Sequence, residues 1–158
     1  MCLGVYIGSC RELPITAASA GEVDVFHVVK VESDEDEPFL HTVLDAPYVV
    51  RACAPPHGCG CGFGYEAPAV VRDTIDGIPS DVSAAIVRNY LARVQIVRDL
   101  RRYLRSAAGA ADVRVWAMWC EPKPPRGSTE VSLSFFGGRS FGFESDWLYL
   151  VRGEGRSR

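Results

Sequence analysis

The longest regular pattern of apolar and polar positions in the chain predicts a helix over residues 80–108. Apolar side chains recur there at every third or fourth position, which gives an amphipathic helix one apolar stripe. Ser80 can serve as N-cap, and Gly109 can end the helix. At 1.5 Å per residue such a helix is roughly 40 Å long and can lie across an entire sheet. The predicted stripe consists of Val87, Tyr90, Leu91, Val94, Val97, Leu100 and Leu104.

Short apolar runs rich in β-branched residues and bounded by Pro, Gly or polar residues predict strands. Residues 40–44 fit either a helical turn or a short strand. Residues 136–142 contain glycines without a following lysine and helix, so they indicate a hairpin turn rather than a phosphate-binding loop. The predicted strands are Cys2–Ser9, Val25–Val31, Tyr48–Cys53, Val113–Cys120, Val131–Phe136 and Trp147–Val151.

This set of elements predicts an α+β fold. One helix cannot supply the crossovers of an all-parallel sheet, so the sheet should be mixed or antiparallel. We expect five to six strands with the long helix packed on one face. Residues 1–152 should form a single domain, and residues 153–158 a polar C-terminal tail.

The composition and the net charge limit the kinds of partner that we expect this chain to bind. The chain has 158 residues, of which 47% are hydrophobic and 23% charged, and its net charge of -3 does not favour nucleic acid or an anionic membrane. The predicted helix has a basic face without the lysines and aromatic residues of a nucleic-acid surface, so we interpret it as solvated or as facing a protein partner. That face carries Arg88, Arg93, Arg98, Arg101, Arg102 and Arg105.

The start of the chain lacks the basic and apolar regions of a secretion signal, and no apolar run approaches the ~20 residues of a membrane span. Only Lys30 and Lys123 are lysines, which is typical of a GC-rich bacterium. We therefore expect a bacterial, cytoplasmic protein. In a reducing compartment its six cysteines should be core residues, metal ligands or reactive thiols rather than disulfides.

The strongest chemical signal is the run His-Gly-Cys-Gly-Cys-Gly-Phe-Gly-Tyr that starts at His57. Its glycines permit unusual backbone conformations, so the loop can wrap tightly around a bound group. Thiolate and imidazole are preferred ligands of zinc and similar metals, which makes Cys59, Cys61 and His57 candidate ligands. If the first strand pairs antiparallel with Tyr48–Cys53, Cys2 lies near this loop and becomes the fourth candidate, with Cys53 as a substitute.

Three other interpretations of these cysteines stay open. The run can be a structural turn with two buried, inert thiols. Cys59 or Cys61 can instead be a reactive or redox thiol. If Met1 is removed, Cys2 becomes an N-terminal nucleophile whose α-amine acts as base, although amidohydrolases of that type have larger folds. His27 and His41 are more simply core or surface residues than ligands.

Several motifs resemble a small family of uncharacterised bacterial proteins that begin Met-Cys-Leu and carry a His-x-Gly-Cys-Gly-Cys-Gly-Phe-like turn. The resemblance extends through the long helix to the strand that contains Trp116 and Cys120, and it implies a site at Cys2, His57, Cys59 and Cys61. It implies no activity. The residues that carry it are Met1-Cys2-Leu3, Tyr6-Ile7, Leu13-Pro14, Phe26-His27-Val28 and His57-Gly58-Cys59-Gly60-Cys61-Gly62-Phe63.

The leading hypothesis is therefore a small metal-binding domain with zinc on the His57/Cys59/Cys61 turn, and with iron or copper as alternatives. The second is a thiol-dependent enzyme or redox protein that uses Cys59, Cys61 or Cys2. The third is a metal-free protein-interaction module that presents the arginine face of the helix.

Overall fold

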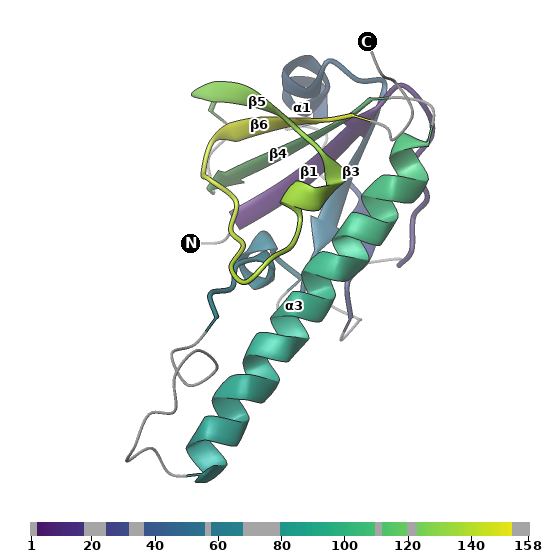
Figure 1. Ribbon diagram of the computed structural model, residues 1–158. Coiled ribbons are helices and arrows are strands. Elements are labelled where there is room, and N and C mark those ends of the chain that lie inside the picture. The colour runs from purple at the N-terminus through teal and green to yellow at the C-terminus, as the bar shows by residue number, and fades with distance from the viewer. Residues whose placement is uncertain are drawn as a thin grey trace.

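A mixed sheet forms the centre of the molecule, in the strand order β2-β3-β1-β4-β6-β5 (Figure 1). The computed structural model describes residues 3–17, 25–31, 37–55, 58–67, 80–109, 112–119 and 123–152. All neighbouring strands within these ranges pair antiparallel except β5 and β6, which are parallel. The predicted α+β class, with a mixed sheet and one long helix, is confirmed. The strands are β1 (Leu3–Ser9), β2 (His27–Lys30), β3 (Tyr48–Cys53), β4 (Val113–Trp119), β5 (Gly127–Val131) and β6 (Trp147–Val151).

The central strand β1 is buried on both faces of the sheet. Val5 and Ile7 belong to one hydrophobic core, whereas Tyr6 packs against the other beside Trp116, with ring centroids 6.3 Å apart. A strand covered on both sides reads as a continuous apolar run instead of an alternating one, which explains its sequence.

The long helix α3 (Ser80–Ala108) covers one face of the sheet and has the predicted bounds (Figure 1). Its second half is buried through residues such as Val97, Leu100 and Leu104. In the first half Tyr90 is partly buried against the core, whereas Leu91 of the predicted stripe is 56% exposed, because these turns extend past the sheet (Figure 1). Among the described residues, no helix is long and apolar enough to cross a membrane.

Helix α1 (Glu37–Leu44) packs on the opposite face, so residues 40–44 form a helical turn rather than a strand. Leu40 and Leu44 are fully buried against Trp116 of β4. Arg114 Nη1 donates to the carbonyl oxygen of Leu44 at 2.7 Å and pairs with Asp45 Oδ2 at 2.7 Å. The arginine thereby satisfies a carbonyl at the C-terminal end of α1, where cations are favoured.

The predicted strand Val131–Phe136 and the predicted hairpin turn over residues 136–142 are both wrong. The strand lies earlier, at β5, and the 3-10 turn η2 (Leu133–Phe135) follows it. A hairpin turn is excluded because β5 and β6 run parallel. Leu133 and Phe136 are three positions apart and both buried, so the run follows a helical turn into the core. Since β5 is an exposed edge strand, its polar sequence lacks the apolar signal of the other strands.

Candidate functional site

The cysteine turn begins where β3 ends, next to the start of β1. The register pairs Val5 with Ala52, so the start of β1 lies beside the end of β3, as the predicted antiparallel pairing requires. Beyond β3, Ala54 forms an isolated bridge with Cys59, and the Ala54 amide donates to the Cys59 carbonyl at 3.2 Å. Gly58, at φ 63°, supplies the left-handed backbone conformation that reverses the chain within this bridge.

Two glycines let the turn lie directly on the sheet. A Cβ on Gly60 would lie 2.6 Å from Val5 Cγ2 and 2.9 Å from the Leu3 carbonyl oxygen. A Cβ on Gly62 would lie 2.6 Å from the Ala54 Cβ. Gly60 begins the 3-10 turn η1 (Gly60–Phe63), which carries Cys61. Close backbone packing, rather than flexibility, therefore explains the glycines on both sides of Cys61.

The far end of the turn is fixed by side chains and by a second bridge. Phe63 is fully buried, and its ring lies 6.1 Å from that of Phe26. Arg93 of α3 donates through Nη1 to the Gly64 carbonyl at 2.8 Å, so this arginine of the predicted solvated face has a structural contact. Tyr65 and Phe141 exchange two backbone hydrogen bonds of 2.7 and 2.8 Å. The turn is thus held at both ends.

The two sulfurs of this turn have different environments. Cys59 is 5% exposed, whereas Cys61 is exposed and is a free thiol. The backbone amide of Leu3 donates to Cys61 Sγ at 3.2 Å, across 58 positions of sequence. One sulfur is therefore accessible from solvent and at the same time oriented by a backbone donor from β1.

The predicted ligand set is only partly within the described residues. Cys59 and Cys61 lie on one turn, whereas His57 and Cys2 fall outside the described ranges, as does Cys120. Cys53 is buried at the end of β3. Within the described residues, no three His, Cys, Asp or Glu side chains are close enough together to hold a metal. The metal site therefore stays a prediction.

Cys10 directly follows β1, at the end of the strand opposite Leu3, and is an exposed free thiol. It is therefore separated from the turn by the length of the strand and provides a natural control thiol.

The backbone donor to Cys61 Sγ could not be found from the sequence. The Leu3 amide leaves no sequence signal because every residue except proline carries the same donor.

His27 is 1% exposed and lies opposite Cys53, so it is a core residue, in line with the simpler interpretation. Its Nδ1 lies 2.8 Å from the Val25 carbonyl oxygen, and its Nε2 is buried with no hydrogen-bond partner among the described residues.

Tyr65 marks the boundary between the turn and helix α3. Burial raises the pKa of its phenol, the neighbouring Tyr90 raises it further, and Arg98 acts in the opposite direction. Its hydroxyl donates to the Gly138 carbonyl at 3.3 Å. This tyrosine therefore stays protonated at neutral pH and serves as a hydrogen-bond donor.

Comparison with protein-family models, with curated proteins and with solved structures gives no match.

Proposed function

We propose that this protein is a small metal-binding domain that holds zinc on the Cys59–Cys61 turn. The observation that carries the proposal is the 3.2 Å contact from the Leu3 amide to Cys61 Sγ. Thiolate ligands of metals carry backbone N–H donors of this kind in their outer shell, which orient the sulfur and balance its charge.

The composition of the turn supports the same assignment. Cys59 and Cys61 alternate with glycines that pack closely on β1 and β3, so a compact loop can direct both thiolates at one ion. Zinc takes four ligands, and the turn supplies two. We propose His57 and Cys2 for the other two, because His57 is joined to Gly58 and Cys2 is joined to Leu3. Four protein ligands would make the metal structural, whereas three would leave one position for a water or substrate.

Metal analysis of the purified, tag-free protein tests this proposal. The expected result is about one equivalent of zinc per chain after reducing, chelator-free preparation. A Cys59→Ser, Cys61→Ser double variant should lose the zinc, whereas a Cys10→Ser variant should keep it. Circular dichroism of each variant separates loss of metal from loss of fold.

Two outcomes would overturn the proposal. One is a wild-type protein without zinc, iron or copper, and the other is a folded double variant that keeps its metal. Single His57→Ala and Cys2→Ser variants then assign the remaining ligands, because removal of a true ligand weakens metal retention.

A thiol-dependent activity is the second candidate, and the exposure of Cys61 favours it. A reactive thiol at this position should be alkylated by iodoacetamide faster than Cys10, which is also exposed. Equal rates at Cys61 and Cys10, measured by peptide mass spectrometry on metal-free protein, would reject this candidate.

A further inference from the structure

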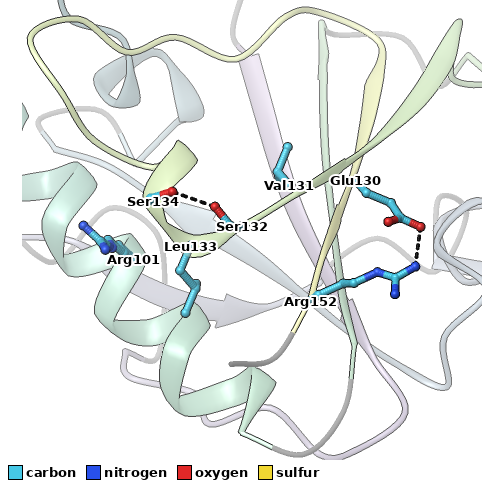
Figure 2. Close-up of a pocket in the computed structure, with 7 residues that line it drawn as sticks. All are labelled: Arg101, Glu130, Val131, Ser132, Leu133, Ser134 and Arg152. Carbon is cyan, nitrogen blue, oxygen red and sulfur yellow. Dashed lines mark hydrogen bonds and ion pairs between the residues drawn. The ribbon is translucent and has the colours of Figure 1, made fainter. Parts of the chain in front are cut away.

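A cleft of about 440 Å³ opens between helix α3 and the segment that joins β5 to η2. Arg101 of α3 lines one side, and Arg152, which follows β6, lines the other (Figure 2). Ser132 and Ser134 lie between the two arginines (Figure 2). The volume lies within the range of sites for small organic ligands. Neither the cysteine turn nor its proposed metal contributes to this cleft.

The lining of the cleft is positive, although the chain as a whole has a net charge of -3. The lining residues include two arginines and one carboxylate, Glu130, which pairs with Arg152, while Asp112 outside the lining also acts on Arg152. Arg152 Nη2 contacts Glu130 Oε1, but the two side chains are 43% and 51% exposed. An exposed pair of this kind contributes little stability, so Arg152 can exchange Glu130 for another oxyanion.

Arg101 provides the buried part of the positive charge. Its Nε atom is buried and has no hydrogen-bond partner among the described residues. A buried donor of a charged group normally has an acceptor, and a guanidinium preferentially binds carboxylate or phosphate oxygens. A ligand in the cleft cannot reach the buried Nε, but Arg101 is partly exposed and lines the cleft, so its terminal N–H groups can donate to an oxygen acceptor there.

The serines add neutral donors between the arginines. Ser132 Oγ and Ser134 Oγ are 2.6 Å apart, and either hydroxyl can be the donor. Because only one of the two hydrogens is used in that bond, the other can point to a ligand. Leu133, the residue between the two serines, is buried and adds an apolar wall to the cleft.

We infer that this cleft binds a small organic anion through a carboxylate or phosphate group. The oxyanion lies against Arg101 and the two serine hydroxyls, Arg152 adds a positive charge at the far side of the cleft (Figure 2) once it exchanges Glu130, and the apolar wall contacts the body of the ligand. The combination of few polar groups with an apolar surface is typical of small-molecule sites.

Titration followed by NMR tests the inference on the full-length protein. Inorganic phosphate and citrate are added separately at constant ionic strength, balanced with sodium chloride. We expect saturable amide shifts at residues 132–134 with at least one of the two anions, and the anion that binds more tightly identifies phosphate or carboxylate as the preferred group.

Variants decide whether the cleft residues bind the anion. Arg101→Gln should weaken binding at least about tenfold, since a charged hydrogen-bond partner is lost. A Ser132→Ala, Ser134→Ala variant gives a second test that leaves α3 intact. Arg88→Gln is the matched control, because Arg88 is an exposed arginine of the same helix about 20 Å away along its axis.

The inference is wrong if neither anion gives saturable shifts, or if Arg101→Gln and Arg88→Gln bind equally well. The cleft shares no residue with the cysteine turn, so shifts at residues 132–134 report on the cleft, whereas an effect of either anion on bound zinc would appear at residues 58–65.

Discussion

Gly60 lies where the cysteine turn crosses the start of β1, and its replacement by alanine perturbs this contact alone. The added Cβ would lie 2.6 Å from Val5 Cγ2 and 2.9 Å from the Leu3 carbonyl oxygen. The Leu3 oxygen belongs to the backbone of a central strand, so it cannot rotate away as a side chain can. The turn and the strand must therefore separate.

Gly64 provides the matched control four residues later. Its backbone, at φ -87° and ψ 135°, suits any residue, and a Cβ there would have no non-adjacent neighbour within 4 Å among the described residues. Overpacking a core contact costs about 1–3 kcal/mol. Gly→Ala at a position with space and a suitable backbone stabilises by about 0.4–1 kcal/mol. We expect Gly60→Ala to lower the free energy of unfolding by about 1–3 kcal/mol and Gly64→Ala to leave it unchanged or slightly higher.

Urea unfolding followed by circular dichroism measures both variants. The slope m should stay constant, so that the shift of the midpoint reports stability. Separation of the turn from β1 should also lengthen the contact from the Leu3 amide to Cys61 Sγ, so Gly60→Ala should retain zinc less well than Gly64→Ala. Equal stability of the two variants, within about 0.5 kcal/mol, would refute the argument that close packing requires Gly60.

Two further predictions concern helix α3. Burial raises the pKa of the Tyr103 phenol above its ordinary value of 10.0, so the folded state binds this proton more tightly than the unfolded state. The stability that this residue contributes is complete below pH 10 and falls above it by up to about 1.4 kcal/mol per pH unit, so Tyr103→Phe should lose less stability than the wild type, with the raised pKa of Tyr65 and Tyr149 still acting in both. Urea unfolding between pH 8 and 11 checks this, and parallel curves for the two proteins would contradict it. Leu104→Ala should cost about 2–5 kcal/mol because Leu104 is fully buried, whereas Leu91→Ala should stay within about 0.5 kcal/mol. A comparable cost for Leu91→Ala in the same assay would contradict the exposure of Leu91.

The sequence determined the elements whose signals are local. Helix α3 has the predicted bounds, as do β3 and β6, because each segment contains its own signal, which is a cap, an apolar period or a β-branched run. The fold class followed from counting these elements. Cys59 and Cys61 could also be identified as a candidate site, since a glycine-rich run with alternating thiols needs no tertiary information to be recognised.

The tertiary structure alone decided which parts of these elements are buried and which distant groups meet. The amphipathic pattern continues along α3, but the sheet extends under only its second half, so Val97 is buried and Leu91 is not. Leu133 and Phe136 enter the core through a 3-10 turn and not through a strand, so their spacing does not follow the strand period. The Leu3 amide reaches Cys61 across 58 positions, and the cleft joins Arg101 to Arg152. Such contacts depend on strand order and register, which long-range packing fixes and no local pattern encodes.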